Sequence, residues 1–168
     1  AFGTRFAGEV RGFDLTAYLA PKEARRMDPF MHYGVAAGVQ AVTDSGLDFS
    51  REDPTRSGVI MGSGIGGLEG MEREIGTWAT TRNPRKISPF YIPSTIINMI
   101  AGHLSIRFGL NGPNLAVVSA CTSSAHALGL AMRMIQYGDA DIMIAGGAEH
   151  ASTPTALAGF GQAKALSE

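Results

Sequence analysis

The stretch from Asn114 to Ile135 constrains the fold most, because its hydrophobic pattern changes period at the only cysteine. Residues 115–119 form a short apolar run that favours a buried strand, with two valines at its centre. After Cys121 the apolar residues recur at positions 125, 128, 132 and 135, which is the spacing of one helix face. The sequence therefore predicts a strand, a sharp turn that carries Cys121, and a helix.

Cys121 lies where the first turn of this helix leaves backbone N–H groups unpaired. Those groups and the helix macrodipole favour the thiolate over the thiol. A turn from strand to helix also exposes the side chain beside amides that can hold an oxyanion. A lone cysteine in an apolar run is commonly a small buried hydrophobe, but this position favours a nucleophile for acyl transfer through a thioester.

Two further helices are predicted from their capping residues. Asp28 before Pro29 is a good N-cap for a helix that Gly46 ends. Ser94 is the expected N-cap of a second helix, which Gly109 ends. The sequence thus places a helix before each of two predicted strands.

Short apolar runs at 58–61 and 141–147 predict two more buried strands. Residues 115–145 then form a β-α-β unit, which the general rule makes right-handed, in a sheet covered on both faces. Three segments rich in glycine or proline are predicted to be mainly loops: residues 1–20, 83–93 and 159–166.

Gly62, Gly64 and Gly67 satisfy the G-x-G-x-x-G pattern of dinucleotide-binding loops, directly after a predicted strand. That fingerprint also needs an acidic residue about twenty positions later, at the end of the next strand, and the residues around 86–89 contain none. We therefore interpret the glycines as places where the backbone approaches a substrate or another helix.

The composition excludes several functional classes. A formal net charge of −1 argues against a general nucleic-acid binder, which would carry a strongly basic face or tail. The single cysteine excludes an internal disulfide framework and a cysteine-based zinc cluster, and the four histidines lack metal-ligand spacing. Neither a signal peptide nor an apolar run of membrane-spanning length is found, so a reducing, cytoplasmic setting is expected.

A thiolate nucleophile needs an acid or base partner. His126 lies five residues after Cys121 and is rotated about 140° away from it on a helix. His150 follows a predicted strand, at the end where active sites gather, and is the one local candidate for a cysteine–histidine pair. The more usual interpretation of such a residue is a loop histidine bonded to backbone. His32 and His103 fall within predicted helices as structural residues.

Several motifs resemble those of one family, the β-ketoacyl-acyl carrier protein synthases, specifically type II. The most specific of these motifs are residues 118–126, 137–141, 145–149 and 159–161, and residues 62–67 and 84–98 are also similar. The resemblance implies a thiolase-like α/β fold, in which two βαβαβαββ halves pack as α-β-α-β-α layers. Residues 1–168 would then be most of the first half, and the catalytic histidines and a nearby lysine would belong to the second.

The resemblance also implies roles for individual residues. Cys121 resembles the acyl-accepting nucleophile, and its own N–H resembles one of two oxyanion-hole donors. Ile65 resembles the residue that gates the acyl-chain tunnel. The other positions similar to substrate-binding residues are Phe90, Tyr91, Ile92, Ala120 and Phe160. The positions similar to a docking surface for the acidic carrier protein are Lys22, Arg25, Arg26, Arg85 and Lys86.

Residues 90–92 resemble the loop that reaches the partner subunit's tunnel in the family's homodimer. Tyr91 departs from the more usual phenylalanine there, and its hydroxyl could change chain-length preference. Ser119 and Ser124 stand where the type II pattern often has threonine and glycine. Without the resemblance, the charge run of residues 21–28 would be read as a solvated face.

The implied activity is elongation of fatty acyl chains by decarboxylative Claisen condensation. The implied partners are acyl carrier protein, acyl and malonyl thioesters and a second copy of the protein, and no metal or cofactor is implied. Two alternatives stay open. The chain could be a non-catalytic fragment or dimerisation module, or a cysteine hydrolase that uses His150.

Overall fold

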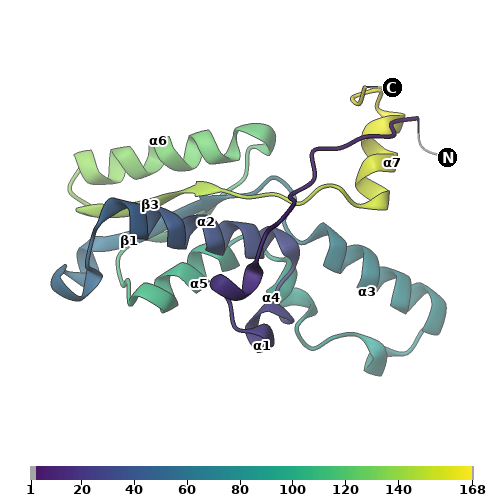
Figure 1. Cartoon of the computed structure of the whole chain (residues 1–168), viewed down its shortest axis with the longest axis horizontal. Helices are drawn as coiled ribbons and strands as arrows, with labels where there is room; N and C mark the ends of the chain where they lie inside the picture. Colours follow the sequence, from purple (N-terminus) through teal and green to yellow (C-terminus); the bar gives the residue numbers. More distant parts are fainter. Residues whose placement is uncertain (1–2, 168) are drawn as a thin grey trace.

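A three-stranded parallel sheet lies at the centre of the computed structural model, which describes residues 3–167 (Figure 1). The strands are β1 (Ser57–Gly62), β2 (Asn114–Val117) and β3 (Ile142–Gly147), in the order β2-β1-β3. In the register of the sheet, Gly62 of β1 lies opposite both Val117 and Gly147. The carboxyl ends of the three strands therefore meet at one edge, as the general rule for active sites of parallel sheets requires.

The place of a strand in the sheet, central or at the edge, explains whether its residues are buried as predicted. All six residues of β1 are buried, because this strand has a neighbour on each side and helices on both faces. The prediction of a buried strand at 115–119 is wrong in its burial and its end. The strand β2 stops at Val117 and lies at the sheet edge, so Leu115 is 43% exposed and Val118 is 58% exposed. The β-α-β unit is confirmed, with β1 inserted between its two strands.

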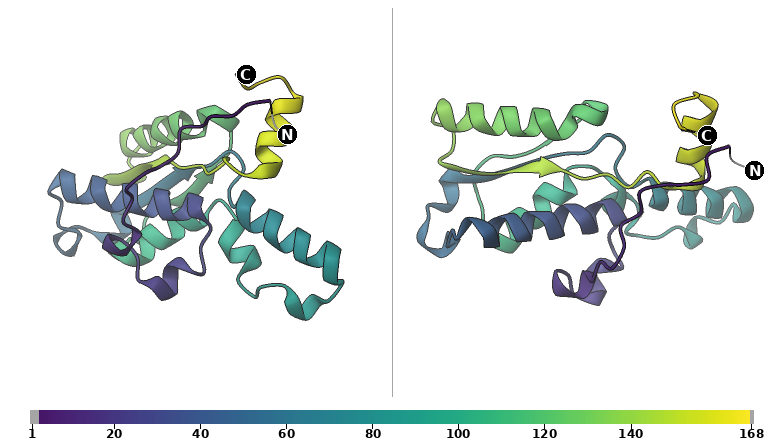
Figure 2. Two further views of the ribbon diagram at one scale, coloured as in Figure 1. Left: turned by 45° about the vertical axis from the view of Figure 1, so that its right-hand side comes forward. Right: turned by 45° about the horizontal axis from the view of Figure 1, so that its top comes forward.

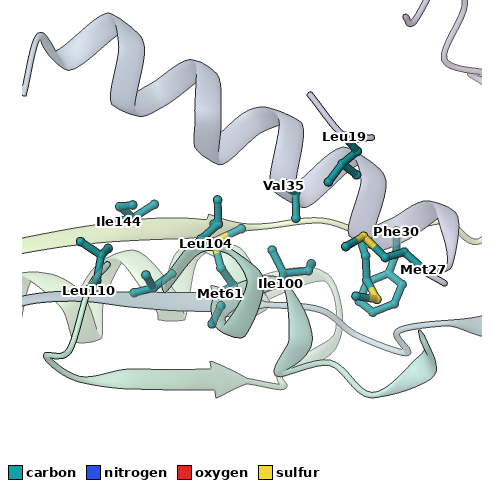
Figure 3. Close-up of a cluster of buried hydrophobic side chains, with 12 residues drawn as sticks. Leu19, Met27, Phe30, Val35, Met61, Ile100, Leu104, Leu110 and Ile144 are labelled. Carbon is teal, nitrogen blue, oxygen red and sulfur yellow. The ribbon is translucent and has the colours of Figure 1, made fainter. Parts of the chain in front are cut away.

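Helices cover both faces of the sheet (Figures 1 and 2). The helices α2 (Pro29–Ser45) and α5 (Met99–Phe108) lie on one face, and α6 (Ser123–Gln136) lies on the other. The main hydrophobic core fills the space between the first face and α2 and α5 (Figure 3). Its largest fully buried side chains are Phe30, Met31, Ile100, Leu104 and Val35.

Two glycines of α2 set the distance to α5. A Cβ atom at Gly34 would lie 2.6 Å from Cδ1 of Ile100, and one at Gly38 would lie 2.6 Å from Cδ1 of Leu104. The two helices therefore pack with the side chains of α5 against the backbone of α2. The lack of a side chain at Gly34 and Gly38 is what allows this close approach.

The predicted caps of α2 are confirmed. Oδ1 of Asp28 accepts a hydrogen bond from Phe30 N at 3.3 Å, and Gly46 ends the helix in the left-handed region with φ +69°. Oδ2 of Asp28 also accepts from Gly70 N at 2.7 Å, which ties the start of α2 to the next part of the chain. Burial raises the pKa of Asp28 despite these two backbone donors.

The second predicted helix begins later than expected. Its end at Gly109, with φ +68°, is confirmed, but α5 begins at Met99, and Ser94 is not an N-cap. Ser94 lies inside a separate short helix, α4 (Tyr91–Thr95), where its hydroxyl donates to the Tyr91 carbonyl. The proline-rich segment 83–93 is therefore only partly loop, because Pro93 falls within the first turn of α4, where proline is tolerated.

The part of the chain that follows β1 and precedes α5 extends away from the sheet (Figure 1). It consists of α3 (Leu68–Thr81), a 3-10 turn at Pro84–Lys86, and α4. The buried carboxylate of Glu74 accepts hydrogen bonds from Ser88 N at 2.9 Å and from Arg73 Nε at 3.1 Å. This carboxylate fixes the loop that leads into α4.

The prediction of a loop at 159–166 is wrong for its first half, because α7 (Pro154–Gln162) includes Phe160. Thr153 caps this helix and Pro154 occupies its first turn, which together outweigh two internal glycines. The remaining short elements are α1 (Pro21–Ala24) and 3-10 turns at Leu15–Ala17, Phe49–Arg51 and Pro54–Arg56. The predicted N-terminal loop is confirmed for residues 3–14, and residues 1 and 2 lie outside the described part.

Candidate functional site

A strained turn carries Cys121 from the sheet edge to α6. Ala120 has φ +51°, which is unusual for a residue with a side chain, and a 3-10 turn spans Ala120–Thr122. Ser123 stabilises this turn: its hydroxyl accepts from Ser119 N at 2.9 Å and donates to the Ala120 carbonyl at 2.7 Å. The predicted strand, sharp turn and helix are confirmed, with Cys121 exposed just before α6.

Backbone hydrogen bonds close the turn that carries Cys121. Thr122 N donates to the Ser119 carbonyl at 3.1 Å, and Ser123 N donates to the Ala120 carbonyl. The turn therefore uses both amides that follow Cys121. The amide of Cys121 precedes both of them in the chain.

Two glycines bring the start of α6 directly onto the sheet. A Cβ at Gly62 would lie 2.5 Å from the Ser123 carbonyl oxygen, and a Cβ at Gly147 would lie 2.7 Å from Oγ of Ser124. Both glycines are the last residues of their strands. Their lack of side chains is therefore what allows the cysteine turn to sit at the carboxyl edge of the sheet.

A cavity of about 480 Å³ opens in front of Cys121. It brings together four of the predicted site residues from distant parts of the chain: Ile65, Ala120, Cys121 and Phe160. Its other lining residues are mostly small, and they come from the ends of β1, β3 and the start of α6: Gly62, Ser63, Gly64, Ser123, Ser124, Gly147, Ala148, Glu149 and Ala151. An apolar, concave site of this kind suits a hydrophobic ligand.

The structure does not bring residues 90–92 to this cavity. Phe90 is the N-cap of α4 and is 38% exposed, and Ile92 is 59% exposed. The guanidinium of Arg26 lies over the Phe90 ring, with its central carbon 4.5 Å from the ring centroid. Arg26, which follows α1 (Pro21–Ala24), thus contacts the start of α4. Phe90 lies four residues after Lys86 in the chain.

All five predicted docking residues are exposed basic residues. Three lie in or just after α1, and two lie in the 3-10 turn Pro84–Lys86: Lys22, Arg25, Arg26, Arg85 and Lys86. Arg26 also contacts Phe90, which lies four residues after Lys86 at the start of α4. A local basic surface can attract an acidic partner even when the net charge of the chain is near zero.

Glu149 is a site residue that the sequence analysis did not identify. Its Oε2 accepts from Gly64 N at 2.7 Å and from Ile65 N at 2.8 Å. Its Oε1 accepts from Gly66 N at 3.1 Å and from Ser63 Oγ at 3.1 Å. Three consecutive amides and a hydroxyl therefore surround one carboxylate, which is the geometry of an anion-binding nest.

This contact accounts for Gly64, the central glycine of the G-x-G-x-x-G pattern. The loop that resembles a phosphate-binding sequence uses its amides for a carboxylate of the same chain, in agreement with the rejection of dinucleotide binding. A Cβ at Gly64 would lie 2.8 Å from Oε2 of Glu149, so a larger residue there would have to displace the carboxylate. The signal available in the sequence was an acidic residue two positions after a predicted strand.

Two of the four histidines have hydrogen-bonding contacts to groups other than Cys121. His126 Nδ1 lies 2.5 Å from Oγ of Ser119, and His32 Nε2 lies 2.9 Å from the Ala24 carbonyl oxygen. His103 is half-buried in α5, and desolvation lowers its pKa. In residues 3–167, no histidine lines the cavity of Cys121.

His150 lines a different cavity, of about 320 Å³. Its Nδ1 lies 3.6 Å from Oε2 of Glu69, and its ring meets that of Tyr33 edge to face at 5.9 Å. The structure therefore does not bring together the predicted pair of Cys121 and His150.

Two further features bear on the class of site. Over the described range 3–167, there is no grouping of histidine, cysteine and acidic residues suited to a metal ion. Within the same range, no helix combines the length and apolarity needed to cross a membrane.

Comparison with known proteins gives a family match over nearly the whole chain. The model described as "Beta-ketoacyl synthase, N-terminal domain" matches residues 4–168. The 3-oxoacyl-[acyl-carrier-protein] synthase 2 of Vibrio cholerae is 60% identical over 167 residues, which are 99% of this chain and 40% of that protein. The protein of the same name from Staphylococcus aureus is 42% identical over 169 residues, with 41% of its length covered.

Solved structures agree with these sequence matches. A β-ketoacyl synthase from Burkholderia phymatum superposes with a TM-score of 0.85 at 30% identity, over 99% of this chain and 41% of that one. A ketosynthase complex of a type II polyketide system, solved with its acyl carrier protein, has a TM-score of 0.85 at 25% identity. That match covers 92% of this chain and 44% of the other. The chain thus spans about two fifths of the length of the relatives that it matches.

Proposed function

Because the chain belongs to the β-ketoacyl synthase family, whose N-terminal domain it matches, we propose that it forms the acyl-accepting part of a fatty acid condensing enzyme. Its α/β architecture with a parallel sheet is that of a partial thiolase-like fold. One observation carries the proposal. The only cysteine of the chain is exposed on a strained turn, at the wall of a cavity that Ile65 and Phe160 also line.

In the proposed reaction, Sγ of Cys121 attacks the carbonyl carbon of an acyl thioester on a carrier protein. The bond from that carbon to the carrier's sulfur breaks, and the carrier leaves as a thiolate, which takes a proton from water. The amide of Cys121 donates to the oxyanion of the tetrahedral intermediate. The acyl chain extends into the apolar cavity beside Ile65 and Phe160.

The second step forms the new carbon–carbon bond. A malonyl group on a carrier protein loses CO₂, and the resulting carbanion attacks the acyl carbon held on Cys121. The thiolate of Cys121 then leaves, so the enzyme returns to its starting state. Acid–base groups for the decarboxylation come from outside these residues, since no histidine among residues 3–167 lines the cavity of Cys121.

The partners follow from the surface. Acyl carrier protein is proposed to dock on the exposed basic residues of α1 and of the turn Pro84–Lys86, and residues 90–92 are proposed to contact a second subunit. One solved relative is a ketosynthase in complex with its acyl carrier protein, which supports the first of these. A reducing compartment such as the cytoplasm keeps the exposed Cys121 thiol available.

Two variants test the role of Cys121 in the complete protein. Incubation with an acyl carrier thioester should add the mass of the acyl group to Cys121, and iodoacetamide should block this addition. Condensation should fall by about a thousandfold or more in Cys121→Ala and in Cys121→Ser, because neither keeps the thiolate. An unmodified Cys121, or condensation that survives Cys121→Ala, would show that the proposal is wrong.

The docking surface has a separate test. Arg85→Glu should raise KM for carrier-bound substrates by roughly tenfold at low salt, and the effect should shrink as salt is added. Arg51→Glu is a matched control, because it changes the net charge equally at an exposed residue of the Phe49–Arg51 turn. Equal effects of the two variants would exclude a specific docking surface.

The alternative of a cysteine hydrolase is not supported by the geometry, because His150 lies at Glu69 and lines another cavity. The alternative of a non-catalytic fragment concerns these 168 residues alone. The isolated chain is expected to show no condensation, and turnover by it would contradict the assignment of acid–base groups to other residues.

A further inference from the structure

We propose that Glu149 is a positioning residue that sets the width of the acyl cavity by holding the backbone of Ile65. The inference rests on the proposed function, in which the acyl chain extends into the cavity beside Ile65. Both residues line the cavity of Cys121. The step from Glu149 to Ile65 depends only on contacts within the described chain.

The strands explain how the two residues meet. Gly62 of β1 pairs with Gly147 of β3, and Ala148 N donates to the Gly62 carbonyl at 3.0 Å, so the pairing continues past the strand ends. Glu149 then lies beside the loop that follows β1. Residues 85 positions apart in the chain are thereby joined at the carboxyl edge of the sheet.

The loop needs an acceptor with two equivalent oxygens. Oε2 accepts from the amides of Gly64 and Ile65, and Oε1 accepts from Gly66 N and Ser63 Oγ. An ionised carboxylate has acceptor sites for all four donors, whereas an amide side chain would turn an NH₂ group toward two of them. The charge also strengthens each bond relative to a neutral acceptor.

The consequence for Ile65 follows from the position of its amide. Its N–H is the second of three consecutive amides held by one carboxylate, so the backbone on both sides of its Cα is fixed. Its side chain is 39% exposed and lines the cavity, so side-chain packing leaves it partly free. The carboxylate thus supplies the rigidity that a glycine-rich loop lacks.

The test uses the isosteric variant Glu149→Gln in the complete protein. Amide exchange at residues 64–66 should accelerate by about tenfold or more, because bonds to a charged acceptor are lost. The ratio of kcat/KM for long and short acyl thioesters should change by about tenfold, as expected when the wall of an apolar pocket moves. Glu149→Asp keeps both oxygens and should lose less protection than Glu149→Gln.

Glu72→Gln is the matched control. Glu72 also joins distant segments, through Oε1, which accepts from Thr155 N at 2.8 Å and from the Thr155 hydroxyl. One oxygen of a glutamine side chain can replace that acceptor, so this variant should leave both the exchange at 64–66 and the chain-length ratio within about twofold of the wild type. A change as large as that of Glu149→Gln would indicate general loosening of the fold.

A double variant decides whether Glu149 acts through Ile65. In an Ile65→Gly background, Glu149→Gln should not change the chain-length ratio further, because the side chain that it positions is gone. The inference is overturned if the two effects add, or if Glu149→Gln leaves exchange at 64–66 unchanged. If the complete wild-type protein does not condense acyl thioesters, the proposed function is contradicted. The amide-exchange experiment would still test whether Glu149 holds residues 64–66.

Discussion

The two faces of the sheet are packed in different ways. On the face of α2 and α5, large side chains such as Phe30, Ile100 and Leu104 are fully buried. On the face of α6, the buried cluster consists of Ile60 with two alanines of the helix, Ala127 and Ala131. Small residues let α6 lie close to the sheet, whereas the other face is held by side-chain volume.

The outer surface of α6 sharpens this difference. Its large apolar residues point away from the sheet and are exposed in this chain: Leu128 at 56%, Met132 at 54% and Ile135 at 45%. The sheet-facing alanines position α6, the helix that follows Cys121. The large buried side chains that stabilise the chain lie on the opposite face of the sheet, against α2 and α5. The fold therefore separates the part that stabilises the chain from the part that carries the proposed chemistry.

The largest effect expected in this chain is a loss of stability from the α5 side. Leu104→Ala should lower the free energy of unfolding by about 2–5 kcal/mol, because Leu104 is fully buried and a cavity would remain. Leu128→Ala, a leucine on α6, should change it by less than about 0.5 kcal/mol. Urea unfolding of the two variants measures both. Similar losses would mean that the two faces contribute alike.

A smaller loss is expected where α6 meets the sheet edge. Gly62→Ala would place a Cβ 2.5 Å from the Ser123 carbonyl oxygen, which cannot move without the start of α6. The expected cost is about 1–3 kcal/mol, together with a changed rate of alkylation of Cys121. Thermal unfolding and iodoacetamide labelling follow the two effects. An unchanged labelling rate would show that the cysteine turn does not depend on Gly62.

One substitution within α6 is expected to raise the free energy of unfolding rather than lower it. Gly129 lies inside the helix, and a Cβ there would meet nothing within 4 Å. Gly129→Ala should therefore stabilise the chain by about 0.5–1 kcal/mol, because alanine loses less backbone entropy in a helix. Urea unfolding measures this gain. A loss of stability would show that the outer surface of α6 is already covered in the isolated chain.

The smallest expected effect is a pH dependence of the free energy of unfolding that comes from His103 of α5. Desolvation lowers the pKa of His103, with Glu23 opposing the shift, so the folded state favours the neutral imidazole. This contribution is fully present above the ordinary value of about 6.5 and is lost as the pH falls through the lower folded-state pKa.

The free energy of unfolding of the wild type should therefore fall more between pH 7.5 and pH 5.5 than that of His103→Gln. Parallel urea titrations at the two pH values measure the difference. Equal losses in the two proteins would assign the pH dependence to other groups.

Much of the site could be predicted from the sequence because its signals are local. The change of hydrophobic period at Cys121 located the turn, and Asp28 and Gly46 marked both ends of α2. The motifs that resemble the family led to Ile65 and Phe160, which the structure brings to the cavity of Cys121. Their roles in catalysis stay predictions.

The missed features depend on contacts between distant residues. The apolar spacing of α6 predicted a helix but not which side meets the sheet, since Ala127 and Ala131 carry a weaker hydrophobic signal than the exposed Leu128. Glycines inside α7 concealed a helix that Thr153 caps. The edge position of β2 could not be read from its apolar residues, because strand order is a property of the whole sheet.

The sequence by itself determined where the nucleophile candidate lies and which type of element flanks it, because capping, periodicity and turn chemistry act over a few residues. Only the tertiary structure decided that a carboxylate 84 residues away holds the amide of Ile65. The physical reason is the parallel sheet. Its pairing of β1 with β3 brings two strand ends together, and no local pattern encodes which ends will be neighbours.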